Sequence, residues 1–141
     1  MNSDIYNGEG YLDLTAHEAI RSLEGKSRVF RPLVYICSPY SGDTQANVQR
    51  ARKFSQFAVE EGYIPIAPHL LFPQFLDDSI KEERELGLFF GNVLMDRCAE
   101  LWVLGGVISS GMDAEIKRAK RKNYTIRYFT MEFEEENNHG L

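Results

Sequence analysis

The sequence has little cysteine, no long apolar run and no excess of basic residues. Its two cysteines, Cys37 and Cys98, show no C-x-x-C spacing and no nearby histidine pair, so neither a zinc site nor a disulfide framework is expected. No apolar stretch approaches the roughly 18 residues of a membrane-spanning helix. The N-terminal residues 1–10 lack a signal-peptide pattern. These absences predict a soluble cytoplasmic protein, and no feature indicates a metal or an organic cofactor.

The charge balance argues against a nucleic-acid polymer as partner. The net charge is −5, from 21 acidic and 16 basic residues, so the basic surface that binds polyanions is absent overall. One basic cluster, residues 117–122, falls late in a predicted helix, where cations suit the carbonyl end of the helix dipole. A small molecule is therefore the expected partner.

Short apolar segments alternate with helical patterns along most of the chain. Residues 33–37 form a continuous apolar run typical of a buried parallel strand. Further strands are predicted at 63–68, 100–104 and 123–129, helices at 44–61, 79–97 and 111–122, and a loop at 69–80. This alternation predicts an α/β fold of flavodoxin or Rossmann type. It is a three-layer sandwich with a parallel sheet of four or five strands and helices on both faces.

The ends of the chain differ from this core. Thr15 and Glu18 have the spacing of a capping box, which predicts a short helix within an N-terminal helical appendage, residues 1–31. The α/β domain is expected at 32–131. Residues 132–141 are acidic and are predicted to form a flexible tail.

Two loops rich in small residues should meet at the carboxyl edge of the sheet, where α/β proteins bind ligands. The loop before residue 111 offers the hydroxyls of Ser109 and Ser110. Ser110 is the predicted N-cap, with the amide of Asp113 as its partner. Gly111 allows close approach to the backbone. Unpaired amides at such a helix start favour an anion such as a phosphate.

Glu115 is the candidate for covalent chemistry. Met112, Ile116 and Ala119 define the helix face expected to pack on the sheet, and Glu115 lies one position off that line. Its carboxylate should project toward the strand ends, partly desolvated but kept ionised by the helix start. Such a group suits attack on an electrophilic carbon with an ester intermediate. The alternative is a surface glutamate that only pairs with the helix dipole.

Three segments carry a resemblance to a known family. They are V-Y-I-C-S-P-Y-S-G-D at 34–43, D-R-C-A-E-L-W-V-L at 96–104 and S-S-G-M-D-A-E-I-K-R-A at 109–119. Together they resemble the nucleoside 2-deoxyribosyltransferase-like superfamily, above all a small branch with an S-x-G-M-x-x-E-I signature. The superfamily also contains 2′-deoxynucleoside 5′-monophosphate N-hydrolases. The resemblance implies a flavodoxin-like sheet and cleavage of an N-glycosidic bond. Glu115 would attack the anomeric carbon, and water or a second base would complete the reaction.

The resemblance also implies roles for other residues. Tyr35 matches a tyrosine that supports the nucleophile, although a core aromatic is an equal alternative. Ser109 stands where the transferases carry an aspartate for the free 5′-hydroxyl and the hydrolases carry a serine for the 5′-phosphate. Because a hydroxyl donates to a phosphate that a carboxylate would repel, Ser109 favours a nucleotide. Ser38 and Ser41 fall in a loop that resembles the second phosphate loop of the hydrolases.

One position departs from the family pattern. Asn92 stands where family enzymes usually carry an aspartate that protonates the leaving base or orients the sugar. An amide can hydrogen-bond but cannot donate a carboxylic proton. Asp96, one turn later, could substitute, or it could be a solvated helix residue. The departure leaves open a nucleotide-binding or sensing module without turnover. Glycosidic chemistry on NAD or ADP-ribose-type signals is a further alternative.

The remaining candidates are contacts to the substrate. His69 follows the second predicted strand at the same sheet edge and could contact a base, or it could be structural. Tyr40 could stack on a base, and Gly42 and Met112 complete the predicted binding set with the serines named above. The resemblance further implies a homodimer or higher homo-oligomer in which a neighbouring subunit often completes the site.

Overall fold

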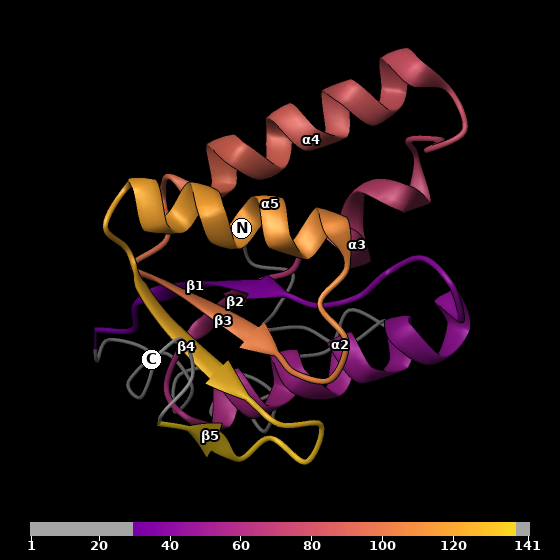
Figure 1. Cartoon of the computed structure of the whole chain (residues 1–141). Helices are drawn as coiled ribbons and strands as arrows, with labels where there is room; N and C mark the ends of the chain where they lie inside the picture. The colour runs from indigo at the N-terminus through magenta and orange to yellow at the C-terminus, as the bar shows by residue number, and fades with distance from the viewer. Residues whose placement is uncertain (1–29, 138–141) are drawn as a thin grey trace, which may run out of the picture. The chain divides into compact units, whose positions relative to one another are not determined.

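The computed structural model describes residues 30–137, so the predicted N-terminal helix around Thr15 lies outside the described residues. The chain divides into two units, 1–31 and 32–141, and every element described belongs to the second. In chain order the elements are β1 (Leu33–Cys37), α2 (Thr44–Glu60), β2 (Ile64–Ile66), α3 (Pro68–Leu71), the 3-10 turn η1 (Phe72–Gln74), α4 (Lys81–Met95), β3 (Glu100–Leu104), α5 (Ser110–Arg121), β4 (Thr125–Phe129) and β5 (Glu135–Glu136) (Figure 1).

The sheet is mixed but mostly parallel. Its strand order is β2-β1-β3-β4-β5, and only β5 runs antiparallel to its neighbour. The chain passes from β1 to one side for β2 and returns to the other side for β3, so the strand order switches between β1 and β3. At this switch Cys37 pairs with Val103, which brings the loops after β1 and β3 to the same edge. The predicted α/β class is confirmed.

Helices cover both faces of the sheet. On one face α2 buries Phe54 and Ala58 against a cluster that includes Trp102. On the other face α5 buries Met112 and Ile116, as the apolar spacing predicted, and α4 contributes its last residues to the same cluster. Figure 1 shows α2 on one side of the sheet and α5 and α4 on the other. Within residues 30–137, no helix is both long and apolar enough to cross a bilayer.

Residues 132–137, which belong to the predicted flexible tail, contain a turn and the short strand β5. The chain turns at Phe133, which has a φ of 66°, and Glu135 then pairs with Phe129 of β4. Arg127 of β4 holds the Glu135 carboxylate through two hydrogen bonds of 2.8 and 2.9 Å. By composition alone, an acidic run is typical of disorder. Composition does not show that Arg127 on the neighbouring strand pairs with one of these acids.

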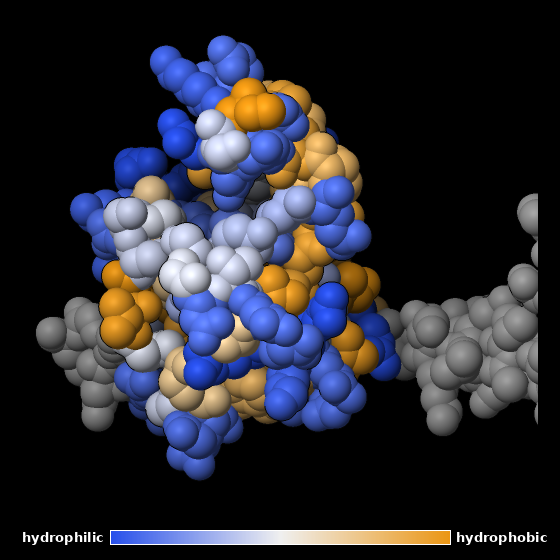
Figure 2. Space-filling model, turned by 90° about the vertical axis from the view of Figure 1, so that its right-hand side faces the viewer, coloured by the Kyte–Doolittle hydropathy of each residue, from blue (hydrophilic) through white to orange (hydrophobic). Residues whose placement is uncertain are grey.

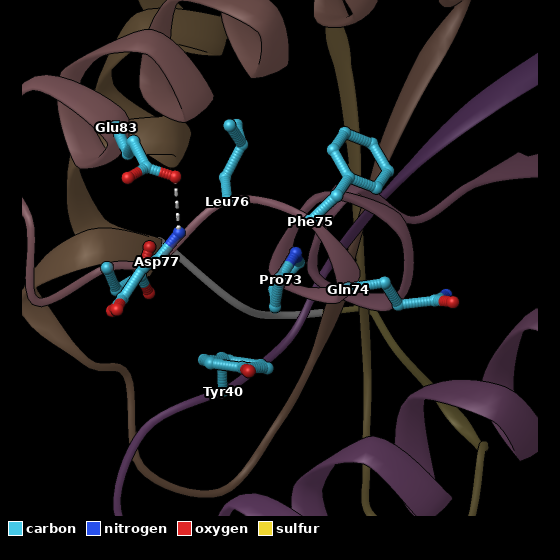
Figure 3. Close-up of a pocket in the computed structure, with 8 residues that line it drawn as sticks. Tyr40, Pro73, Gln74, Phe75, Leu76, Asp77 and Glu83 are labelled. Carbon is cyan, nitrogen blue, oxygen red and sulfur yellow. Dashed lines mark hydrogen bonds between the residues drawn. The ribbon is translucent and has the colours of Figure 1, made fainter.

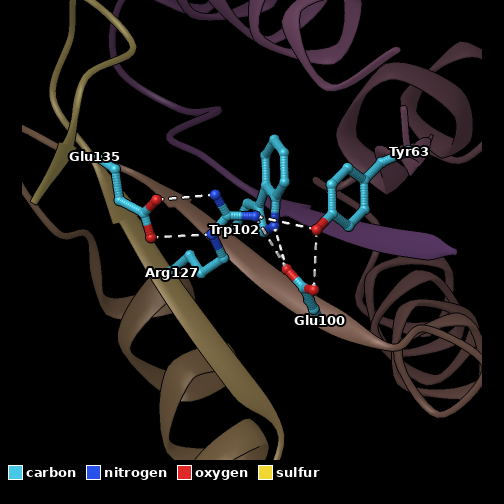
Figure 4. A network of polar contacts seen from close by, with 5 residues as sticks. All are labelled: Tyr63, Glu100, Trp102, Arg127 and Glu135. Carbon is cyan, nitrogen blue, oxygen red and sulfur yellow. Dashed lines mark hydrogen bonds and ion pairs between the residues drawn. The ribbon is translucent and has the colours of Figure 1, made fainter. Parts of the chain in front are cut away.

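Arg127 is the centre of a polar network on the α2 face (Figure 4). Its guanidinium lies over the ring of Trp102, with 4.7 Å from Cζ to the ring centroid. It also donates to the hydroxyl of Tyr63 at 3.2 Å and to Glu100 at 3.4 Å. The Trp102 indole donates to the same Glu100 carboxylate at 2.8 Å. The network links Glu135 of β5 to Arg127 of β4, to Glu100 of β3 and to Tyr63.

The predicted loop at 69–80 contains two short helical elements. Pro68 opens α3 at its first position, where a missing N–H costs nothing, and η1 follows directly. Helix α4 therefore begins at Lys81 and not at residue 79. Elements this short give no periodic signal, so the sequence pattern did not reveal them.

Candidate functional site

A cavity of about 320 Å³ opens at the carboxyl ends of β1 and β3. We call it the Glu115 cavity. Figure 2 looks onto this edge of the molecule and shows the surface hollowed beneath the part of the chain that contains α4. Eleven of the twelve predicted site residues line it: Tyr35, Ser38, Tyr40, Ser41, His69, Asn92, Ser109, Ser110, Gly111, Met112 and Glu115. The cavity wall thus brings together residues that are distant in sequence, from β1, α3, α4 and α5.

Gly42 is the predicted site residue that the cavity wall does not include. Its φ of 93° lies in the left-handed region, and its carbonyl accepts from the amide of Thr44 at 2.9 Å. Asp43 then caps α2 by accepting from the amide of Ala46 at 3.3 Å. The positive φ of this glycine serves the turn that starts α2, and its predicted role in ligand binding stays a prediction.

The start of α5 lies one residue earlier than predicted. Ser109, and not Ser110, is the N-cap, and its hydroxyl accepts from the amide of Met112 at 3.2 Å. The Asp113 carboxylate does not reach back toward the cap, because it pairs with Lys117 at 2.9 Å. The first turn of a helix leaves its amides without intrahelical partners. The amides of Ser110 and Gly111 therefore point out of the helix start, beside the cavity, and can receive an anion.

Glu115 turns its carboxylate into the cavity wall. Its side chain is only 15% exposed, and Oε1 lies 3.6 Å from Nε2 of His69. Oε2 is buried and has no hydrogen-bond partner among the described residues. A buried carboxylate oxygen without a partner costs free energy, and a donor group of a ligand in the cavity would satisfy it. The alternative of an exposed surface glutamate does not describe this side chain.

Tyr35 lies beside the same carboxylate. Burial within β1, and then the nearby negative charge of Glu115 and a hydrogen-bonding interaction with that carboxylate, raise the pKa of the Tyr35 phenol far above its ordinary value. The hydroxyl therefore stays protonated and is available as a donor toward Glu115 or a ligand. It needs room, and Gly91 of α4 provides it. A Cβ placed on Gly91 would stand 3.3 Å from the Tyr35 oxygen.

Neither cysteine competes with Glu115 as a nucleophile. Burial, followed by the charge of Glu115, raises the pKa of the Cys37 thiol well above its ordinary value, and its sulfur donates to the Met112 carbonyl at 3.8 Å. Burial also raises the pKa of Cys98 to about 11. Both thiols are free and buried. Among the side chains of residues 30–137, no group of three His, Cys, Asp or Glu residues could hold a metal ion.

His69 contacts two other predicted site residues, Tyr40 and Glu115. Its ring stacks on Tyr40, with centroids 5.4 Å apart and planes 21° apart. Its Nε2 faces Glu115, and 35% of its side chain remains exposed. The stack fixes the plane of the imidazole, and the exposed part leaves it accessible from the cavity.

The contribution of α4 and of the loop before it is what sequence reasoning missed. Asp78 and Arg84 line the cavity, together with Gly87, Leu88 and Gly91. The spacing of Arg84, Gly87 and Gly91 places them on one helix face, so the signal was present. Asp96, the possible substitute for the aspartate that Asn92 replaces, does not line the cavity. It pairs with Arg118 at 3.2 Å and Lys122 at 3.0 Å, and Lys122 in particular lowers its pKa.

A second, more open hollow adjoins the Glu115 cavity (Figure 3). This outer depression of about 460 Å³ is lined by Tyr40, Pro73, Gln74, Phe75, Leu76, Asp77, Asp78 and Glu83. Four residues, Tyr40, Pro73, Leu76 and Asp78, line both hollows. Internal contacts hold its acidic rim, because Asp77 accepts from the amide of Ser79 at 2.9 Å and Glu83 accepts from the amide of Asp77 at 3.1 Å.

The family described as "Domain of unknown function (DUF7768)" matches residues 32–129. The chain belongs to this family. Comparison with curated proteins and with solved structures gave no match. The matched segment contains β1 to β4 and the whole wall of the Glu115 cavity, whereas β5 lies beyond it. The cavity is therefore a feature of the DUF7768 domain itself.

The arrangement of the DUF7768 cavity combines three chemical functions. A buried carboxylate with one unpartnered oxygen can act as a nucleophile or a base. The start of α5 and the hydroxyls of Ser38, Ser41 and Ser109 can hold an anion, with Arg84 on the same wall. Aromatic and apolar side chains, including Tyr40 and Phe72, can contact a flat ring. A ligand that carries an anion, a reactive carbon and a ring suits this set.

Proposed function

We propose that the protein breaks or transfers the N-glycosidic bond of a nucleoside or nucleoside 5′-monophosphate, with Glu115 as the nucleophile. The observation that carries the proposal is the buried, unpartnered Oε2 of Glu115 beside a cavity bounded by the start of α5. An anomeric carbon is the electrophile that such a carboxylate attacks in retaining glycosidases. The resemblance to the nucleoside 2-deoxyribosyltransferase-like superfamily supports the same reaction.

The proposed reaction has two steps. An oxygen of Glu115 bonds to the anomeric carbon while the carbon–nitrogen bond breaks, and the electron pair leaves with the base. Water then hydrolyses the sugar ester, or a second base displaces Glu115 and takes the sugar. Tyr35 keeps its proton and can donate toward the carboxylate, which would orient the attacking group.

The substrate we favour is a 5′-monophosphate. Ser109 lies in the cavity wall at the start of α5, six residues before Glu115, and Ser38 and Ser41 face the same space. Hydroxyls and free helix amides donate to phosphate oxygens, and Arg84 supplies a positive charge nearby. A carboxylate at position 109 would repel the phosphate and favour a free 5′-hydroxyl.

The broader setting is also proposed. The sheet with helices on both faces is consistent with a three-layer sandwich of flavodoxin or Rossmann type, and we expect the protein to act in the cytoplasm. We expect it to work without a metal or organic cofactor and to bind a small molecule, not a nucleic-acid polymer.

We propose a homodimer formed through the outer face of α4. Leu86, Phe89 and Val93 are exposed and share one stripe of α4, with Glu82 in its first turn and Arg97 in the turn that follows the helix. A two-fold axis through the middle of α4 would pair Leu86 with Val93 of a second copy and Glu82 with Arg97. The stripe is therefore complementary to itself in both charge and apolarity, as an isologous interface requires.

Binding without turnover is the second candidate function, because Asn92 lines the cavity where a carboxylic acid would serve catalysis. Chemistry on NAD or ADP-ribose-type signals is a third. The outer depression favours it, because it adjoins the cavity and could hold a ligand longer than a mononucleotide. Both candidates predict the same anion site, but binding alone gives no product, whereas chemistry on NAD or ADP-ribose-type signals does.

The test is release of free base from a panel of ribo- and deoxyribonucleosides, their 5′-monophosphates and NAD, followed by chromatography. We expect base release from at least one monophosphate, and a loss of at least about a thousandfold in kcat for Glu115→Gln with ligand binding retained. Binding by both proteins without any base from the wild type would favour the sensing module. Equal turnover by both proteins would remove Glu115 from the chemistry.

A further inference from the structure

A departing nucleobase needs a proton, and the cavity wall offers few groups that can give one. A base that leaves as an anion is a poor leaving group, so general acid catalysis at this step is worth about 10² to 10⁴ in rate. Asn92 has no acidic proton, and Arg84 does not release one in proteins. The raised pKa of Tyr35 makes its phenol a weak acid near neutral pH.

His69 differs from these groups in both place and chemistry. Its Nε2 lies 3.6 Å from Oε1 of Glu115, while the other carboxylate oxygen has no partner. His69 lines the cavity beside Tyr40, and 35% of its side chain is exposed, so a base bound in the cavity can lie against its imidazole. The stack on Tyr40 holds the ring in plane, and an imidazole carries nitrogens that can donate and accept a proton.

We propose that His69 is the acid–base residue of the reaction and protonates the departing base. The proposal rests on the proposed function and adds a residue to it. It makes α3, a short helix that begins at Pro68, part of the catalytic apparatus and not only a connection.

The proton and electron balance closes over the two steps. In the first, a Glu115 oxygen bonds to the anomeric carbon, the carbon–nitrogen electron pair goes to the base, and the imidazolium proton moves to that base. In the second, neutral His69 takes a proton from water as the water oxygen bonds to the anomeric carbon, and the ester electron pair returns to Glu115. Free base and the sugar leave, and the imidazolium and carboxylate are restored.

The charged and titratable groups that share the cavity wall with His69 come from every element around it. They are Tyr35 of β1, Tyr40 of the following loop, Asp78 before α4, Arg84 of α4 and Glu115 of α5. Asp78 is the rival acid, because it lines the wall and carries a carboxyl group. A variant of Asp78 therefore belongs in the test.

The experiment compares monophosphates that share the cleaved sugar but differ in the acidity of the departing base. Thymine and 5-fluorouracil form one such pair, and hypoxanthine and 7-methylhypoxanthine form another; the second member of each leaves more easily without a proton. For His69→Gln we expect kcat to fall about a hundredfold or more on the first member and less than about tenfold on the second.

Two further variants keep the test decisive. His69→Phe preserves a ring against Tyr40 and should show the same steep dependence on the leaving group, even if His69→Gln folds poorly. Asp78→Asn should keep the wild-type dependence, whatever its effect on substrate binding. An equal loss on both members of a pair, or none, would overturn the role of His69. Steep dependence in Asp78→Asn instead would assign the acid to that residue.

Failure of this inference and failure of the proposed function give different results. If the wild type releases no base from any nucleotide, the glycosidic reaction itself is wrong. If the wild type releases base and Glu115→Gln does not, but His69→Gln loses activity uniformly, the reaction stands and His69 only positions Glu115.

Discussion

Gly91 of α4 lies directly against the hydroxyl of Tyr35 on β1, and a Cβ at Gly91 would stand 3.3 Å from that oxygen. The side chain of Tyr35 is buried and cannot swing away, so a methyl group there must displace the hydroxyl by a few tenths of an ångström. The contact links the position of the outer helix to the residue beside Glu115. Small changes in α4 are therefore expected to reach the proposed nucleophile.

Gly91→Ala is expected to lower kcat about tenfold, because small displacements of a positioning group are costly in catalysis. The helix should gain up to about 1 kcal/mol in propensity, which the tight contact with Tyr35 largely offsets. Gly87→Ala on the same helix is the matched control for stability, because its Cβ would lie at an ordinary 3.6 Å from Leu76. Steady-state kinetics and thermal unfolding measure both effects. A Gly91→Ala protein with the stability gain of Gly87→Ala and full activity would contradict the contact.

Much of the fold could be predicted from the sequence, because strands that are buried on both faces of a sheet are continuous apolar runs. The apolar runs of β1 and β3 predicted those strands to the residue. The short α3 gives no periodic signal. Strand β5 is held by the ion pair of Glu135 with Arg127 on the neighbouring strand, which composition alone does not reveal. The cavity wall from β1 and α5 was predicted, since small-residue loops after parallel strands must meet. Apart from Asn92, the wall from α4 was not, because the apolar Leu86, Phe89 and Val93 lie on its exposed face and obscure which side faces the core.

Ser109 has two roles that substitutions can separate. Ser109→Ala removes the N-cap of α5 and should lower the free energy of unfolding by about 1 kcal/mol. Ser109→Asp keeps a good cap, so stability should stay near that of the wild type, but its charge should repel a 5′-phosphate. We expect Ser109→Asp to weaken binding of a monophosphate about tenfold or more while binding of the free nucleoside is unchanged or improved. Calorimetric titration of both ligands measures this difference, and equal effects on both would exclude a phosphate at this position.

Glu135 should contribute to stability in a pH-dependent way. Hydrogen bonds from Arg127 lower its pKa below the ordinary value of 4.5. Because the folded pKa is depressed, the contribution is complete above the unfolded pKa and is lost as the pH falls through the folded one. Glu135→Gln should reduce the free energy of unfolding at pH 7 by at most about 1 kcal/mol, since the pair is partly exposed. The difference from the wild type should shrink at acid pH below that ordinary value.

Urea unfolding across this pH range measures the effect of Glu135→Gln. Glu132→Gln removes the same charge from the exposed turn between β4 and β5 and serves as control. If both variants show the same pH dependence, net charge and not the Arg127 pair accounts for it.

The outer face of α4 is expected to hold two copies together. Phe89→Asp places a charge at the centre of the apolar stripe and should convert a dimer into a monomer, as measured by light scattering during gel filtration. Val107→Asp, on a loop residue that is 84% exposed and away from α4, is the control and should not change the mass. A wild type that is monomeric at high concentration, or a dimer that survives Phe89→Asp, would refute this interface.

The most direct measurement is to trap the sugar on the enzyme. A nucleoside monophosphate with fluorine at the 2′-position slows breakdown of a glycosyl ester, because it disfavours the oxocarbenium-like transition state. Peptide mass spectrometry of the treated protein should find the sugar phosphate attached to Glu115, and Glu115→Gln should carry none. An adduct on another residue, or base release by Glu115→Gln at the wild-type rate, would contradict Glu115 as the nucleophile.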